Sequence, residues 1–181
     1  MNIAGVYYES VNDGEGMRTV IFVSGCSHNC YNCHNPNTHD INYGIEFTNE
    51  LKEEIFDNIE KRPFITGITI SGGDPLHENN AEAVYNLIVE IKDRFPDKNI
   101  WLYTGYKWEH IFCPVVTDDM NFERDRLIDN RINVVKLCDV VIDGRYVDEL
   151  RDVTLLWRGS SNQRVIDVKK SLEESRIVLY N

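Results

Sequence analysis

Hydrophobic residues along this chain alternate between short continuous runs and helical spacing. Four runs rich in β-branched and apolar residues predict buried strands, at residues 18–24, 65–71, 99–104 and 139–142. After the first run, Thr48 is placed to cap a helix that carries Leu51, Ile55 and Ile59 on one face. Apolar residues spaced three and four apart predict a second helix from Ala81 to Phe95. Strands that alternate with helices pair in parallel, so the fold class is α/β with a mainly parallel sheet.

A turn signal follows each predicted strand. The residues concerned are Gly25 with Cys26, then Gly72, Gly73 and Asp74, then Thr104 with Gly105, and finally Asp143 with Gly144. The carboxyl ends of parallel strands lie at the same edge of a sheet, so these four turns are expected to converge on one rim. One cofactor can then contact them all. The polar stretch at residues 119–131, before the fourth strand, is expected to be helical.

Composition narrows the class of protein. The 181 residues are 42% hydrophobic and 27% charged, without internal repeats, and predict a single globular domain over residues 1–181. A formal net charge of −11 argues against nucleic acid as a partner, because phosphate backbones are bound by clustered cations. The first ten residues lack a signal-peptide pattern and no stretch has the length of a membrane span, so a cytoplasmic location is expected.

Three of the five cysteines, Cys26, Cys30 and Cys33, lie within eight positions, which is typical of a metal site and not of a disulfide framework. Their Cys-x3-Cys-x2-Cys spacing suits a [4Fe-4S] cluster with three protein ligands and one open iron. Zinc is the alternative, with the fourth ligand drawn from His28, His34 or His39. The spacing of the cysteines alone is compatible with the cluster and with zinc. Cys113 is expected in a loop and Cys138 as a small buried residue.

The turn after the second predicted strand reads Ser71-Gly72-Gly73-Asp74-Pro75. Two glycines allow the backbone to approach a ligand closely and to offer N–H and C=O groups to an amino-acid-like moiety. A tight strand-to-helix turn with no ligand is the alternative. The turn, together with the cysteine loop, favours the cluster over zinc. The histidines are expected at the surface or in supporting positions, with His77 ordering this turn.

These two loops together resemble those of the radical S-adenosylmethionine (SAM) enzymes. Within that superfamily the chain is similar to the glycyl-radical activating enzymes, and specifically to those that serve anaerobic ribonucleoside-triphosphate reductases. The similarity covers roughly residues 1–168 and runs in order through residues 11–18, 23–35, 71–77, 103–106, 141–145 and 157–164. The chain departs from the family pattern at Asn32, where many members carry an aromatic residue, and at Glu15, where relatives often have proline.

The resemblance implies a fold, a site and two cofactors. It implies a partial (βα) barrel of the radical SAM type, with an open lateral face, and a [4Fe-4S] cluster held by Cys26, Cys30 and Cys33. SAM is then expected to contact Asn32, Cys33, His34, Gly72, Gly73 and Asp74, with Thr104, Gly105 and Asp143 as further candidates. No side chain is expected to act as a general acid or base, because the cofactor supplies the chemistry.

The implied reaction is reductive cleavage of SAM to methionine and a 5′-deoxyadenosyl radical, which takes hydrogen from a glycine on the large subunit of the reductase. The implied partners are that subunit and a low-potential electron donor such as a flavodoxin; a homodimer within a mixed complex is compatible with this reaction. Alternatives are a formate-lyase-type activase, a small-molecule radical SAM enzyme, or a non-catalytic zinc or iron-sulfur module. Residues 157–164 disfavour the first two. We expect this segment to contact the partner, with Arg158 and Arg164 pairing with its carboxylates; capping of the core is the alternative.

Overall fold

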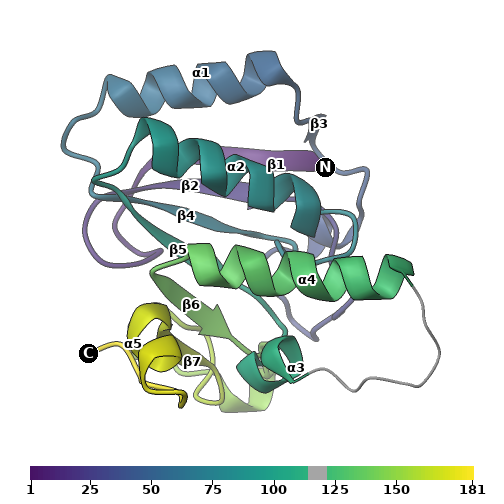
Figure 1. Cartoon of the computed structure of the whole chain (residues 1–181). Helices are drawn as coiled ribbons and strands as arrows, with labels where there is room; N and C mark the ends of the chain where they lie inside the picture. Colours follow the sequence, from purple (N-terminus) through teal and green to yellow (C-terminus); the bar gives the residue numbers. More distant parts are fainter. Residues whose placement is uncertain (114–121) are drawn as a thin grey trace.

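The fold is built on one seven-stranded mixed sheet, in the order β3-β1-β2-β4-β5-β6-β7 (Figure 1). The computed structural model describes residues 1–113 and 122–181. The four central strands are parallel, as the hydrophobic runs predicted: β2 (Arg18–Val23), β4 (Gly67–Gly72), β5 (Asn99–Tyr103) and β6 (Val140–Asp143). Their carboxyl ends therefore share one edge of the sheet.

The strands that flank this parallel centre pair antiparallel with their neighbours, and this arrangement was not predicted from the sequence. Strand β1 (Asn2–Ser10) pairs with β2, β3 (Ile45–Glu46) pairs with β1, and β7 (Arg164–Asp167) pairs with β6. Strand β1 is mostly half-exposed and β3 and β7 are short, so none carries a long continuous apolar run. The sheet is thus mainly parallel only at its centre.

Helices α1 (Asn49–Glu60), α2 (Ala81–Arg94) and α4 (Phe122–Leu137) lie on one face of the sheet (Figure 1). The Thr48 hydroxyl accepts a hydrogen bond from the Leu51 N–H at 3.3 Å, which confirms the predicted cap of α1. Of the helix expected at residues 119–131, residues 119–121 lie outside the described part, and α4 continues beyond it to Leu137. The short helices are α3 (Trp108–Phe112), α5 (Val168–Glu173) and the 3-10 turns Pro36–His39 and Asp148–Leu150.

Alternating residues of the central strands divide the core between the two faces. Ile100 and Leu102 join the main core beneath the helices, whereas Trp101 of the same strand packs on the opposite face. There the Trp157 and Tyr180 rings cover Trp101, with ring centroids at 5.0 and 5.2 Å. In the described part of the chain, no helix is long and apolar enough to cross a bilayer.

Arg18, at the start of β2, has a completely buried side chain. Its guanidinium donates to the Thr69 hydroxyl at 2.7 Å and to the Asn99 side-chain oxygen at 2.7 Å, and lies 5.1 Å from the Trp101 ring centroid. Burial lowers the pKa of Arg18 to about 10. These contacts offset the loss of hydration at the amino ends of the strands, and leave the opposite edge for the functional loops.

Candidate functional site

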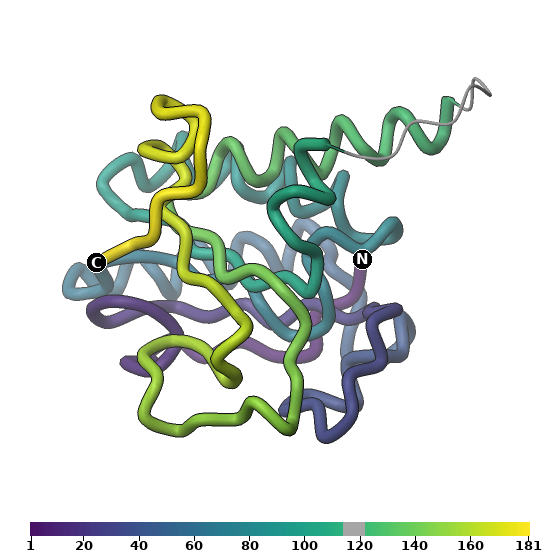
Figure 2. Tube along the Cα trace, turned by 90° about the horizontal axis from the view of Figure 1, so that it is seen from below, coloured from purple at the N-terminus to yellow at the C-terminus, as the bar shows by residue number. Residues whose placement is uncertain are grey.

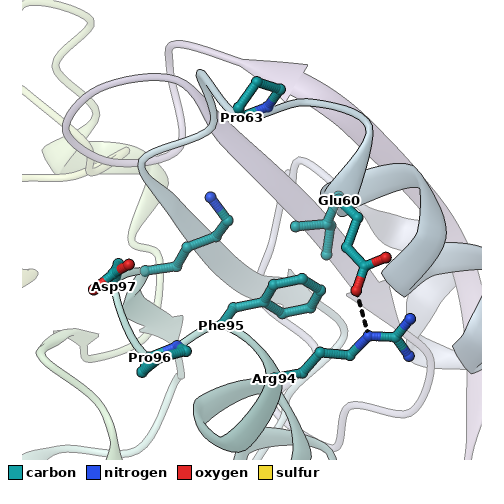
Figure 3. Close-up of a pocket in the computed structure, with 8 residues that line it drawn as sticks. Glu60, Pro63, Arg94, Phe95, Pro96 and Asp97 are labelled. Carbon is teal, nitrogen blue, oxygen red and sulfur yellow. Dashed lines mark hydrogen bonds and ion pairs between the residues drawn. The ribbon is translucent and has the colours of Figure 1, made fainter.

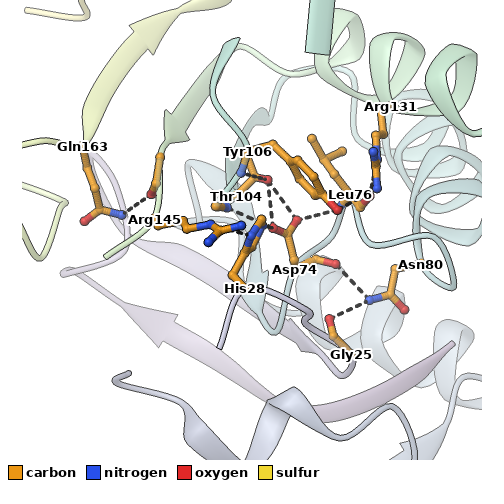
Figure 4. Close-up of polar contacts among 12 residues, drawn as sticks. Gly25, His28, Asp74, Leu76, Asn80, Thr104, Tyr106, Arg131, Arg145 and Gln163 are labelled. Carbon is orange, nitrogen blue, oxygen red and sulfur yellow. Dashed lines mark hydrogen bonds and ion pairs between the residues drawn. The ribbon is translucent and has the colours of Figure 1, made fainter. Parts of the chain in front are cut away.

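The turns that follow β2 and β4 are joined by backbone hydrogen bonds. Gly73 N–H donates to Val23 O at 2.7 Å, and Asp74 N–H donates to Gly25 O at 2.8 Å. The buried Asn80 side chain spans the same two turns, because its amide donates to Ser24 O at 2.8 Å. The same amide donates to Asp74 O at 3.0 Å and to Gly25 O at 3.4 Å (Figure 4). The convergence predicted from the strand pattern is therefore confirmed for the cysteine loop and the glycine turn.

Asp74 ties the β5 end to these two turns. Its carboxylate is 1% exposed and accepts hydrogen bonds from four groups: Leu76 N–H at 2.8 Å, the Thr104 hydroxyl at 2.9 Å, Gly105 N–H at 2.9 Å and the His28 ring Nε2 at 2.7 Å (Figure 4). Charge-assisted bonds of this kind are stronger than neutral ones. Asp74 therefore holds three loops together and has its lone pairs engaged within this chain.

His28, in the cysteine loop, is a site residue whose contacts the sequence analysis did not foresee. Its ring lies against Gly105, where an added Cβ would come within 2.2 Å of the His28 Cδ2 atom. The ring Nε2 contacts Asp74, and Nδ1 accepts a hydrogen bond from Arg145 Nε at 3.1 Å. The only sequence signal was its position between Cys26 and Cys30. With both ring nitrogens engaged, His28 is not a free zinc ligand.

The three clustered cysteines are partly buried free thiols. Burial, aided by the charges of Asp74 and Cys30 and opposed by backbone hydrogen bonds from residues 28 and 29, raises the pKa of the Cys26 thiol to about 11. Burial is also the main cause that raises the pKa of Cys30, followed by the charge of Cys33, while a backbone hydrogen bond from Tyr146 and the Arg145 charge oppose this shift. The Cys30 thiol thus acts electrostatically on Cys26, and Cys33 on Cys30, and bound iron would offset this cost of ionisation.

The donor chemistry suits an iron-sulfur cluster better than a single metal ion. Within residues 1–113 and 122–181, no three His, Cys, Asp or Glu side chains meet closely enough to hold one ion. In a [4Fe-4S] cluster each thiolate binds a different iron, so the sulfurs need not meet at one point. Three thiols on one partly exposed loop fit such a group.

The two glycines after β4 approach the protein's own backbone. Gly72 has a φ of +101°, and a Cβ there would lie 2.6 Å from Val23 O. A Cβ on Gly73 would lie 2.6 Å from Gly25 O and 2.8 Å from Thr38 O. The sequence predicted close approach to a ligand, with a tight turn as the alternative. Both glycines form a tight turn packed against the chain's own backbone, and this turn fixes the start of the cysteine loop.

Other predicted site residues divide into two groups. Asn32 and His34 are exposed at the outer side of the cysteine loop, and Thr104 lies at its inner side, on Asp74. Asp143 is buried but directed elsewhere, because it accepts from Trp108 N–H at 2.8 Å and pairs with Arg164. The described structure therefore gives Asp143 a role in anchoring α3.

Arg164 is not an exposed loop residue, contrary to the expectation that it pairs with a partner's carboxylates. It begins β7, and its Nε donates to Asp143 at 2.9 Å. Two further nitrogens of Arg164 donate to the two Glu109 carboxylate oxygens, both at 2.8 Å. A guanidinium with two carboxylate partners in its own chain has little left to offer another protein.

Replacing Glu109 with glutamine should reduce stability in a pH-dependent way. The hydrogen bonds from Arg164 lower the pKa of Glu109 from an ordinary 4.5 to about 2, so this contribution is complete above pH 4.5 and is lost as the pH falls towards 2. The Glu109 side chain is 53% exposed, which limits the loss at pH 7 to below about 1 kcal/mol. Urea unfolding of the wild type and of Glu109→Gln between pH 7 and 3 measures this difference in stability. A difference that grows on acidification would contradict this assignment.

A cavity of about 490 Å³ lies beside the cysteine loop. It is lined by His28, Gly105, Tyr106, Lys107, His110, Arg145, Val147 and Asn162. Lys107 and Arg145 give this cavity cationic groups in a chain that is acidic as a whole. A smaller cavity of about 230 Å³ lies between the ends of α1 and α2, where Arg94 binds Glu60 at 2.7 Å beside Phe95 (Figure 3). Of these two cavities, the larger is the one lined by a residue of the cysteine loop, His28.

Comparison with known proteins agrees with this geometry. The family model of the 4Fe-4S single cluster domain matches residues 12–166. The chain is 37% identical over 166 residues to the anaerobic ribonucleoside-triphosphate reductase-activating protein of Escherichia coli strain K12, covering 91% of this chain and 97% of that protein. It is 38% identical over 165 residues to the protein of the same name from Enterobacteria phage T4, covering 91% and 93%. This chain therefore belongs to the family of anaerobic ribonucleoside-triphosphate reductase-activating proteins and contains a 4Fe-4S single cluster domain.

Proposed function

We propose that this protein activates an anaerobic ribonucleoside-triphosphate reductase by generating a glycyl radical on its large subunit, with a [4Fe-4S] cluster and SAM as cofactors. One observation carries the proposal: three free thiols on a loop that Asp74 ties to the glycine turn and to the β5 end, beside a cavity of about 490 Å³. The names of the relatives supply the target. Cys26, Cys30 and Cys33 are the proposed cluster ligands.

When bound, the reduced cluster supplies one electron that cleaves SAM to methionine and a 5′-deoxyadenosyl radical, which takes a hydrogen atom from the target glycine. The chain's own residues bind and orient the two cofactors and shield them from solvent. Asn32, Cys33 and His34 are proposed to line the adenosine side of SAM, and the backbone of Gly72 and Gly73 its methionine end. Asp74 serves this site by holding the loops in place, because its carboxylate is already engaged.

The protein contributes no general acid or base to this scheme, because the hard chemistry belongs to the cofactor. We interpret the mixed sheet as a partial (βα) barrel of the radical SAM type, whose open side admits a loop of the reductase. The electron donor is proposed to be a low-potential protein such as a flavodoxin. The proposal includes a cytoplasmic location and allows a homodimer within the mixed complex.

Anaerobic reconstitution with iron and sulfide tests the proposal. With dithionite and SAM, the protein should turn brown and release 5′-deoxyadenosine and methionine in equal amounts, measured by chromatography. With the reductase added, electron paramagnetic resonance should detect a glycyl radical. A colourless zinc protein, or a brown protein that leaves SAM intact, would refute the enzymatic assignment. SAM cleavage without a radical on the reductase would refute only the target.

A further inference from the structure

The segment after Trp157, of which Asn162 lines the larger cavity, is held against the loop that follows β6. Three of its side chains each bind one backbone group of that loop. The Gln163 amide donates to Gly144 O at 3.0 Å, the Asn162 amide donates to Arg145 O at 2.8 Å, and the Ser160 hydroxyl accepts from Val147 N–H at 3.2 Å. Ser160 is fully buried. These three side chains are therefore used inside the chain.

Gln163 also orders its own segment. Its side-chain oxygen accepts from Gly159 N–H at 3.0 Å and from Ser160 N–H at 3.2 Å, which closes a turn over residues 159–163. Both ends of the Gln163 amide are thus engaged, one within the segment and one on Gly144. Residues 159–163 form a rigid support for residues 144–148.

The supported loop contacts the cysteine loop on both sides of Cys30. Arg145 donates to His28 Nδ1 at 3.1 Å, and the Asn32 amide donates to Asp148 Oδ2 at 3.0 Å. His28 and Asn32 are the residues two before and two after Cys30. In Figure 2 the first part of the light-green trace that follows β6 passes next to the dark-blue trace, and Figure 4 shows Arg145 directed at His28.

The cysteine loop needs such support because of its backbone. Asn29 and Asn32 have φ values of +49° and +52°, in the left-handed region that residues with a side chain adopt at a cost. One left-handed residue lies on each side of Cys30. Asparagine adopts this region more readily than other residues with a side chain, and the contacts of His28 and Asn32 with residues 145 and 148 hold the loop on both sides of Cys30.

We propose that Ser160, Asn162 and Gln163 are positioning residues for the iron-sulfur cluster. Through residues 144–148 they fix residues 28–32, and so set the direction in which Cys30 presents its thiolate. This inference rests on the proposed function, in which Cys30 is a cluster ligand. It replaces the expectation that the segment's main role is to meet the partner.

Hydrogen exchange on the full chain without iron tests the positioning directly. Gln163→Ala and Asn162→Ala should raise the exchange rates of amides at residues 27–33 about tenfold, while amides in β4 and β5 keep their rates. Asn162→Asp, which keeps the size but loses the donated bond to Arg145 O, should act like Asn162→Ala. Ser161→Ala, at the exposed neighbour in the same segment, is the matched control and should change nothing.

A second readout uses the reconstituted protein. In Asn162→Ala the electron paramagnetic resonance lines of the reduced cluster should broaden and the KM for SAM should rise more than kcat falls. Unchanged exchange at residues 27–33 in the Asn162 variants, or an equal rise in β4 and β5, would overturn the proposal; if Gln163→Ala does not fold, the Asn162 variants decide. Because exchange is measured without iron, failure of the wild type to cleave SAM would refute only the proposed function.

Discussion

Replacing Cys30 with alanine is expected to reduce iron in the reconstituted protein from about four atoms per chain to almost none. The same loss is expected for Cys26→Ala and Cys33→Ala. Each change removes one of three proposed protein ligands, and two thiolates hold a four-iron cluster too weakly to survive purification. Iron and sulfide content, with the visible absorbance of the cluster, measures the effect.

Two other cysteines of the same chain provide controls. Cys138 is buried and donates to Val134 O at 3.2 Å, and Cys113 is exposed at the end of α3. Cys113→Ala and Cys138→Ala should keep their iron, although the second loses some core packing. Should Cys113→Ala lose iron as completely as Cys30→Ala, the assignment of three ligands is wrong.

Asp74→Ala is expected to lower the free energy of unfolding of the iron-free chain by about 3–5 kcal/mol, measured by urea denaturation. The reason is that the His28 ring, the Thr104 hydroxyl and the N–H groups of Leu76 and Gly105 would remain buried without their acceptor. Each unsatisfied buried group costs about 1–3 kcal/mol, and partial relaxation makes the sum smaller than additive.

The conservative variant Asp74→Asn keeps the shape of the Asp74 side chain but removes its charge, and so tests the two contributions separately. Its side-chain oxygen can still accept from Leu76 and Thr104, whereas its amide group cannot accept from Gly105 or His28. Its loss of stability should therefore lie between those of the wild type and Asp74→Ala. A stability of Asp74→Ala within 1 kcal/mol of the wild type would show that the three loops are held together by other contacts.

The elements with the longest apolar patterns were the ones predicted correctly from the sequence. The four central strands and α2 carry buried runs or sustained helical spacing, so their hydrophobic pattern alone was enough to predict them. Strand β1 is mostly half-exposed, and β7 follows a segment without regular spacing. Strands β1 and β7 depend on pairing with their neighbours in the sheet, and this contact is not encoded in their own hydrophobic pattern.

The site was predictable where chemistry is local and not where it depends on contacts across the chain. Three closely spaced cysteines indicate a metal loop on their own. The role of His28 emerges only when Asp74, Gly105 and Arg145 are brought to it from three other strand ends. Likewise, the glycine pattern showed that something approaches Gly73, but only the fold shows that it is the backbone of Gly25 and Thr38.

During synthesis on the ribosome, the cysteine loop is made well before the residues that hold it in place. A ribosome adds about 5–20 residues per second, so Gln163 is made roughly 7–26 s after Cys33. Before residues 145–148 are made, the emerging chain has neither Arg145 to hold His28 nor Asp148 to hold Asn32, and Gln163, which holds their loop, is made later still. The three thiols are thus made before their supports, and their final conformation waits for residues 144–163. Iron delivered to a finished site must arrive after those residues have been made.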